Sequence, residues 1–171
     1  MGDAALRLVI MRHAKAGELP GGPDADRPLT PRGHRDAGRA GRWLLAGGLV
    51  PDAVVCSPAR RTRQTWAEVA AQFGREVPVT FDPDLYGTDA AGLREVIGQT
   101  PPGVAVLLCV GHNPAMAELA ENLAGQPLEF PTSAIAVIGL PAPWDEVTAG
   151  AAGDLAAFWT PRLGDGVSAF P

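Results

Sequence analysis

The stretch Leu6-Arg7-Leu8-Val9-Ile10-Met11-Arg12-His13 places an arginine and a histidine directly after a short apolar run near the start of the chain. A run of this length predicts a buried β-strand. Open α/β sheets bind their ligands at the carboxyl ends of the strands, so we expect Arg12 and His13 at a binding edge. A histidine beside a permanent cation can attack or orient an anion, and phosphate suits this pair best.

The composition indicates a single domain in which any anion site is local. The 171 residues, 46% of them hydrophobic, predict one globular domain over residues 1–171. The formal net charge of -5 argues against a protein that holds nucleic acid or an anionic membrane through its overall field. The first apolar run is too short for a signal peptide, and no stretch approaches the ~20 apolar residues that span a bilayer. We therefore expect a cytoplasmic protein.

Three apolar runs are each followed by a segment of helical length, and each segment begins with a capping residue and a proline. Such pairs are typical of helix starts. The expected strands are Leu6 to Met11, Ala53 to Cys56 and Val104 to Val110. The expected helices begin at Thr30-Pro31, Ser57-Pro58 and Asn113-Pro114 and end near Gly47-Gly48, Phe73-Gly74 and Ala124-Gly125.

Weaker signals complete the pattern. They predict short strands at Pro78 to Phe81, Ala134 to Ile138 and Leu155 to Trp159, and a short helix at Ala90 to Ile97. The expected fold is a three-layer α/β/α sandwich whose sheet is mostly parallel with an antiparallel C-terminal portion. The longest irregular segment, Ala16 to Leu29, leaves the Arg12-His13 edge and is a candidate lid or substrate-contact loop.

The second strand is followed by three arginines, Arg60, Arg61 and Arg63. With Ser57 as the cap, a helix starting here would direct backbone N–H groups toward the sheet edge and place Arg61 in its first turn, which is a geometry that binds anions. A solvated arginine face is the alternative interpretation. Arg61 and Arg63 project roughly 160° apart on a helix, so one faces the sheet edge and the other faces water, but the spacing does not say which.

The third strand ends in Val110-Gly111-His112-Asn113-Pro114, which places a histidine before a cap. A capping turn alone would explain these residues. The carboxyl ends of parallel strands share one edge, however, so we expect His112 to meet an arginine of the second strand end and the Arg12-His13 pair there. His34, in a charged helix start, is expected to be a solvated surface residue. Cys56 and Cys109 are expected to be reduced packing residues, and no spacing indicates a metal or nucleotide cofactor.

These motifs together resemble the histidine phosphatase superfamily, which includes the phosphoglycerate mutases. The resemblance rests on Arg12-His13-Ala14-Lys15, on Ser57-Pro58-x-x-Arg61-Thr62-x-Gln64-Thr65 and on Gly111-His112-Asn113. Flanking pieces are similar to the short SixA-type phosphohistidine phosphatases. They are Arg27-Pro28-Leu29-Thr30-x-Arg32-Gly33, Leu85-Tyr86, Phe130-Pro131-Thr132 and Pro161-Arg162.

The resemblance implies a metal-independent phosphatase without a cofactor. His13 would be the nucleophile and form a covalent phosphohistidine, while a backbone acceptor holds its other ring nitrogen. Arg12 and Arg61 would clamp the phosphoryl oxygens, and a protonated His112 would be a further donor. Asn113 would belong to the phosphate-binding set.

One departure from the family pattern concerns the general acid. Many members supply a glutamate, whereas this chain has Asp82-Pro83-Asp84-Leu85-Tyr86 in that region. Asp84 is the nearest candidate acid, and a plain turn residue is an equal interpretation. A labile N–P bond needs a general acid less than an alkyl phosphate does, which favours a phosphohistidine substrate. The short segment between Thr65 and Gly111 leaves little room for a cap, which favours an open site.

The expected partner is therefore a phosphorylated protein or a small phosphorylated metabolite, with neither nucleic acid nor membrane, and the chain is expected to be a monomer or weak homodimer. A small-molecule phosphomonoesterase or a mutase-like enzyme is the first alternative. A non-catalytic phospho-ligand binding regulator is the second. A nucleic-acid module that uses the arginine cluster is the least favoured, because the chain is acidic overall.

Overall fold

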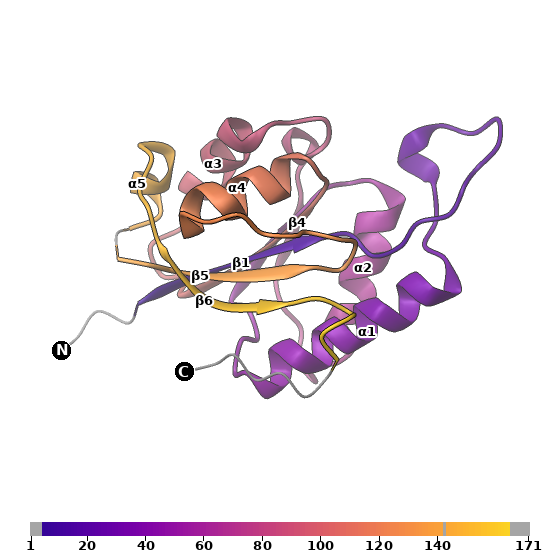
Figure 1. Cartoon of the computed structure of the whole chain (residues 1–171), viewed down its shortest axis with the longest axis horizontal. Helices are drawn as coiled ribbons and strands as arrows, with labels where there is room; N and C mark the ends of the chain where they lie inside the picture. The colour runs from indigo at the N-terminus through magenta and orange to yellow at the C-terminus, as the bar shows by residue number, and fades with distance from the viewer. Residues whose placement is uncertain (1–4, 142, 165–171) are drawn as a thin grey trace.

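The computed structural model describes residues 5–141 and 143–164, which form a six-stranded sheet covered by helices on both faces (Figure 1). The strand order is β3-β2-β4-β1-β5-β6. The strands are β1 (Leu6–Arg12), β2 (Ala53–Cys56), β3 (Val79–Phe81), β4 (Val106–Gly111), β5 (Ile135–Leu140) and β6 (Asp154–Trp159). The helices are α1 (Pro31–Ala46), α2 (Arg60–Ala70), α3 (Ala90–Gly98), α4 (Ala115–Ala124) and α5 (Asp145–Thr148), with 3-10 turns η1 (Asp24–Asp26) and η2 (Pro83–Leu85).

The sheet has the predicted mixed character. Strands β3, β2, β4 and β1 pair in parallel, whereas β5 pairs antiparallel with both β1 and β6. The three-layer α/β/α fold is therefore confirmed. It follows from the sequence because each parallel pair needs a crossover connection, and the helical segments supply those connections.

Strand β1 lies in the middle of the sheet and contributes side chains to both faces. Leu8 and Ile10 belong to the core cluster that includes α3, α4 and α5. Val9 and Met11 belong to the cluster on the other face, which includes α1 and α2. All four side chains are fully buried. A strand buried on both faces reads as a continuous apolar run, which is why β1 was recognisable in the sequence.

The start of α1 agrees with the sequence, but the starts of α2 and α4 do not. Thr30 caps α1 by accepting a hydrogen bond from the Gly33 N–H. Helix α2 begins at Arg60 rather than at Ser57, and α4 begins at Ala115 without a cap from Asn113. Both polar side chains have tertiary partners instead: Ser57 contacts His112, and Asn113 donates to the Phe130 carbonyl.

Two further differences concern short elements. Helix α2 ends at Ala70, because the chain then turns and the Phe73 ring packs against Trp66. Helix α5 lies between the last two strands, where the sequence analysis predicts no helix. Val147 in this helix and Trp144 just before it are buried in the core cluster on that face of the sheet. These two residues give the segment an apolar side.

The parallel strands bring three separate segments to one edge of the sheet. Arg12 at the end of β1 is in register with Gly111 at the end of β4, and Cys56 at the end of β2 is in register with Val110. The residues that follow each strand are therefore neighbours. In the described part of the chain, no helix is long and apolar enough to cross a membrane.

Candidate active site

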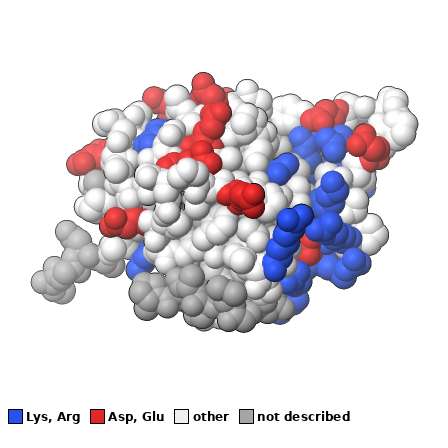
Figure 2. Space-filling model, in the orientation of Figure 1, with Lys and Arg blue, Asp and Glu red and all other residues white. Residues whose placement is uncertain are grey.

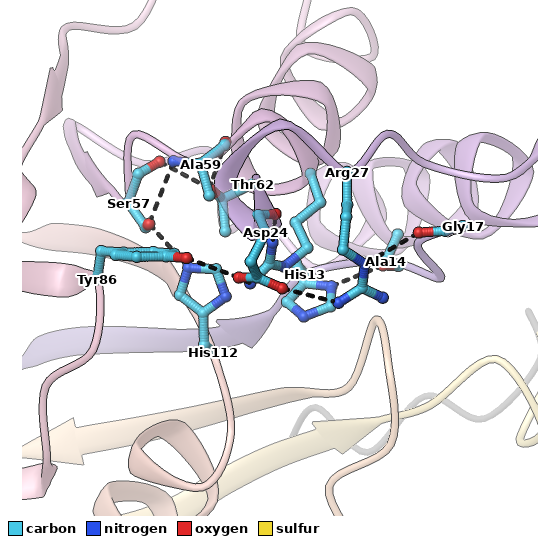
Figure 3. Close-up of polar contacts among 11 residues, drawn as sticks. His13, Ala14, Gly17, Asp24, Arg27, Ser57, Ala59, Thr62, Tyr86 and His112 are labelled. Atoms are coloured by element: carbon cyan, nitrogen blue, oxygen red, sulfur yellow. Dashed lines mark hydrogen bonds and ion pairs between the residues drawn. The ribbon is translucent and has the colours of Figure 1, made fainter. Parts of the chain in front are cut away.

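Backbone hydrogen bonds at the sheet edge join the segments that follow β1, β2 and β4. The His13 N–H donates to the Gly111 carbonyl at 3.0 Å, and the Ser57 N–H donates to the Val110 carbonyl at 3.0 Å. His13 follows β1 and His112 follows β4, and their ring centroids lie 5.3 Å apart (Figure 3). The structure thus brings together the histidines that the sequence placed on separate strands.

His13 is held in one tautomer by the backbone. Its Nδ1 lies 2.7 Å from the Ala14 carbonyl oxygen. A carbonyl oxygen only accepts, so the ring proton is on Nδ1 and Nε2 carries the lone pair. Burial, together with the charges of Arg61, Arg12 and Arg27, lowers the pKa of His13 to about 4, although the Ala14 contact opposes this. The ring is therefore neutral near pH 7 and can act as a nucleophile.

Two arginines contribute guanidinium groups to the site. Arg12 is half-buried at the end of β1, and its Nη1 donates to the Phe130 carbonyl at 3.2 Å. Arg61, in the first turn of α2, has only 7% of its side chain exposed and donates from Nη1 and Nη2 to Asp24. Arg63 projects the other way, with its guanidinium 3.9 Å from the centroid of the Phe81 ring. The structure therefore assigns Arg61 to the sheet edge and Arg63 to the outside.

His112 is neutral in this structure, which differs from the expectation of a protonated ring. Burial and the charge of Arg61 lower the pKa of His112 to about 3, and His13 and Arg12 act in the same direction. Its Nε2 lies 2.8 Å from Ser57 Oγ, whereas Nδ1 is buried without a partner. A neutral histidine donates from only one nitrogen, so the position of its proton decides what it offers to a ligand.

Three buried nitrogen atoms near His13 have no hydrogen-bond partner. Arg12 Nε, Arg61 Nε and His112 Nδ1 are buried without hydrogen-bond partners. Such atoms are rare in folded proteins, and their gathering on three neighbouring segments requires an explanation. An oxyanion with several lone pairs would satisfy both arginine nitrogens, and His112 Nδ1 as well when that nitrogen carries the ring proton. The donor set therefore fits the tetrahedral oxygens of a phosphoryl group.

The structure gives Asn113 and Asp84 local contacts. Asn113 Nδ2 donates to the Phe130 carbonyl at 2.8 Å, so it shares this acceptor with Arg12 and helps to hold the turn before β5. Asp84 is exposed in η2, and its backbone N–H donates to Asp82 Oδ1 at 2.9 Å. The contact of Asn113 is that of a positioning residue, and the contact of Asp84 is that of a turn residue. The phosphate-binding role of Asn113 and the acid role of Asp84 stay predictions.

Sequence reasoning missed the pairing of Asp24 with Tyr86. Asp24 lies in η1, within the long loop, and its Oδ2 accepts from Tyr86 Oη at 2.6 Å and from Arg61 Nη2 at 3.1 Å. Hydrogen bonds from Tyr86, Arg27 and Arg61 hold the pKa of Asp24 well below its usual range. The Tyr86 ring meets His112 edge-on, with centroids 5.5 Å apart. The loop is therefore part of the site wall, joined to it through Asp24.

Other candidate groups lie outside this arrangement. His34 is not simply solvated, because its Nδ1 pairs with Glu68 Oε1 at 2.7 Å between α1 and α2. Cys56 and Cys109 are free and buried, and burial raises the pKa of the Cys56 thiol to about 12. Within residues 5–141 and 143–164, no three histidine, cysteine or acidic side chains are grouped so that they could hold a metal ion.

Comparisons with known proteins identify the family of this chain. The sequence model of the histidine phosphatase superfamily (branch 1) matches residues 8–94. An uncharacterized protein of Mycobacterium tuberculosis is 40% identical over 163 residues, covering 89% of this chain and 100% of that protein. The phosphohistidine phosphatase SixA of Escherichia coli is 33% identical over 139 residues, covering 79% of this chain and 86% of that protein.

The fold comparison gives the same result. The solved structure of a putative phosphohistidine phosphatase SixA from Nakamurella multipartitia superimposes with a TM-score of 0.83 at 30% identity. The match covers 92% of this chain and 97% of that one. With the family match over half of the chain, these likenesses show that the chain belongs to the histidine phosphatase superfamily, in its SixA-type branch.

Proposed function

We propose that this protein is a metal-independent phosphatase that removes a phosphoryl group from phosphohistidine on a protein, through a covalent intermediate on His13. Membership of the histidine phosphatase superfamily supports the phosphatase activity. The observation that carries the mechanism is the neutral His13, whose Nδ1 is held by the Ala14 carbonyl, next to three buried nitrogen atoms without hydrogen-bond partners. These contacts support a nucleophile and an anion clamp at the same edge of the sheet.

The reaction runs in two displacements. His13 Nε2 supplies the electron pair of a new N–P bond, and the leaving nitrogen of the substrate takes the pair of the bond that breaks. Water then attacks the phosphorus, which yields inorganic phosphate and returns neutral His13. Arg12, Arg61 and His112 hold the phosphoryl oxygens in both steps. Fixed donors of this kind stabilise the transition state, and losing one typically costs ~10²- to 10³-fold in kcat.

The acid–base character of the site favours phosphohistidine over an alkyl phosphate. An alkoxide leaving group needs a proton in the transition state, whereas an imidazole leaving group needs less help. The carboxyl group nearest to the arginine clamp is Asp24, and its partners keep it ionised. An ionised carboxylate is a poor proton donor. This supports a substrate with a labile N–P bond.

Hydrolysis of a phosphoramidate and of p-nitrophenyl phosphate, in excess chelator, tests the activity. The wild-type protein is expected to turn over both and to prefer the phosphoramidate, whereas His13→Ala is expected to lose activity. His34→Ala is the matched control, because this histidine lies between α1 and α2 and contacts Glu68. Activity that survives in His13→Ala, or that needs an added metal, would exclude the mechanism.

Two further measurements separate the competing functions. A rapid quench in alkaline denaturant preserves an N–P bond, so labelled phosphoryl on His13 distinguishes an enzyme from a non-catalytic phospho-ligand binder. A panel of phosphohistidine peptides and small phosphoesters, compared by kcat/KM, decides the substrate class. Much faster turnover of one small phosphoester would favour the small-molecule phosphomonoesterase or a mutase-like enzyme instead.

A further inference from the structure

We propose that Ser57 donates its hydroxyl proton to His112 Nε2 and so keeps the ring proton of His112 on Nδ1, where it serves as a donor to the phosphoryl group. Ser57 is then a positioning residue that acts through His112. The inference rests on the proposed function and deepens it, because it specifies how an uncharged histidine belongs to an anion clamp.

Ser57 is fixed in place by its surroundings. The residue follows β2 and is fully buried, and its backbone carbonyl accepts the Thr62 hydroxyl at 2.7 Å. Its own Oγ lies 2.8 Å from His112 Nε2 and 3.4 Å from the Ala59 N–H, which donates to it (Figure 3). The hydroxyl therefore has one donor directed at it already, and His112 Nε2 is the partner left for its own proton.

Counting protons distinguishes the two tautomers of His112. If Nε2 carried the proton, Ser57 Oγ would accept twice, its own hydrogen would have no acceptor, and Nδ1 would keep an unsatisfied lone pair. If Nδ1 carries the proton, Ser57 donates to Nε2 and only the Nδ1–H lacks a partner. One fewer unsatisfied buried group favours the second tautomer by about 5- to 150-fold.

The favoured tautomer is also the one that the reaction needs. Nδ1 lies on the side of the ring that faces His13 (Figure 3). With its proton there, His112 joins Arg12 Nε and Arg61 Nε as a third unpartnered donor. The other tautomer would present a lone pair to the phosphoryl oxygens and repel them. A single buried hydroxyl therefore decides whether His112 stabilises or opposes the transferring group.

The chain is well suited to a direct test, because it contains only three histidines. Long-range ¹H–¹⁵N spectra of the histidine-labelled protein distinguish protonated from unprotonated ring nitrogens. We expect the wild-type His112 to be protonated on Nδ1 alone, and Ser57→Ala to shift the proton toward Nε2. Ser57→Thr, which keeps the hydroxyl, should restore the wild-type pattern, and His34 is the internal reference that should not change.

A wild-type ring protonated on Nε2, or on both nitrogens, would overturn the proposal. So would an unchanged His112 spectrum in Ser57→Ala. Should Ser57→Ala fail to fold, Ser57→Cys provides the same comparison, because its thiol is a weak donor of similar size. Spectra of the other two histidines show whether each variant has kept the native fold.

Kinetics provide a second readout that a merely structural role would not produce. With a phosphoramidate as substrate, Ser57→Ala should lower kcat by about 10- to 10²-fold and change KM much less, because the lost donor acts on developing charge. Ser57→Thr should recover most of this loss. An equal loss of kcat in both variants would contradict the role of the hydroxyl. Lack of His13-dependent turnover in the wild type would instead reject the proposed function, whereas the spectra decide the tautomer independently.

Discussion

At the scale of single residues, the buried position of His13 sets its useful pH range. Because its pKa is lowered to about 4, the ring is neutral above that pH and loses its lone pair only below it. We therefore expect kcat/KM to fall as the pH is lowered through about 4, rather than through the usual value near 6.5. An NMR titration of the His13 ring in the free protein measures the same midpoint without the substrate's own ionisation. A midpoint near 6.5 would show that burial does not control this group.

Asp24 competes with an anionic ligand for the same guanidinium group. Its carboxylate accepts from Arg61 Nη2, while Arg61 Nη1 is held separately by the Asp24 backbone carbonyl. Asp24→Asn removes the negative charge and keeps the backbone contact, so inhibition by inorganic phosphate should strengthen by about 2- to 5-fold at low salt. Half of the Asp24 side chain is exposed, which limits the effect. Weaker phosphate inhibition in Asp24→Asn would mean that the carboxylate mainly orients Arg61.

At the scale of elements, the start of α1 supports the segment that carries the nucleophile. The Thr30 N–H donates to the Lys15 carbonyl at 2.9 Å, and Gly33 lies against the same carbonyl, where a Cβ atom would overlap it. This neighbour is backbone and cannot move aside. Gly33→Ala should therefore push α1 away from the segment after His13, destabilise the fold by about 1–3 kcal/mol and reduce kcat by as much as ~10²-fold.

Gly38→Ala is the matched control in the same helix. A Cβ atom there would lie 3.6 Å from an Arg42 nitrogen and 3.8 Å from a Gln72 nitrogen, which are ordinary contacts. Replacing a helical glycine by alanine should then stabilise the protein by about 1 kcal/mol without changing kcat. Thermal unfolding and phosphoramidate hydrolysis of both variants check the pair. Equal effects of the two substitutions would contradict a special role for Gly33.

The elements also show why some of the molecule was predictable from sequence and some was not. The central strand β1 is buried on both faces and so reads as an apolar run, and the Thr30 cap of α1 is a local contact. Ser57 and Asn113 look like caps as well, but their side chains bond to residues far along the chain. A sequence pattern shows only which contacts a side chain can make with its neighbours along the chain. The capping pattern therefore placed the starts of α2 and α4 too early.

The same distinction applies to the site. His13 and His112 each follow a predicted parallel strand, and the carboxyl ends of neighbouring parallel strands lie at the same edge of the sheet. The sequence therefore predicted that these two histidines are close together. The choice between Arg61 and Arg63 depended on how α2 is rotated against the sheet, which no spacing reveals. The contact of Asp24 with Tyr86 joins residues 62 positions apart, through a loop and a 3-10 turn without periodicity. Irregular segments carry side chains to a site without leaving a sequence signal.

At the scale of the whole molecule, charge is distributed unevenly. The formal net charge is -5, yet on the face shown in Figure 2 the Lys and Arg side chains gather at one end, over α1, α2 and the loop before α1, while Asp and Glu predominate toward the other end. The basic end includes the exposed Lys15, two residues after His13. An anionic substrate close to the site therefore experiences a field of opposite sign to the net charge of the protein.

The net negative charge and the local field of the basic end predict opposite effects of salt on kcat/KM. If net charge governed the encounter, screening would weaken repulsion and kcat/KM for a small phosphoramidate would rise with ionic strength. The local field predicts instead that kcat/KM falls, on the order of 10-fold between ~0.01 and ~1 M salt, because the Debye length shrinks below the size of the basic end. Lys15→Gln should reduce this slope, whereas Arg75→Gln should not, because Arg75 bonds to the Pro51 carbonyl before β2, at the opposite edge of the sheet. Both substitutions change the net charge equally, so equal slopes in the two variants would show that the net charge, not its placement around His13, controls the encounter.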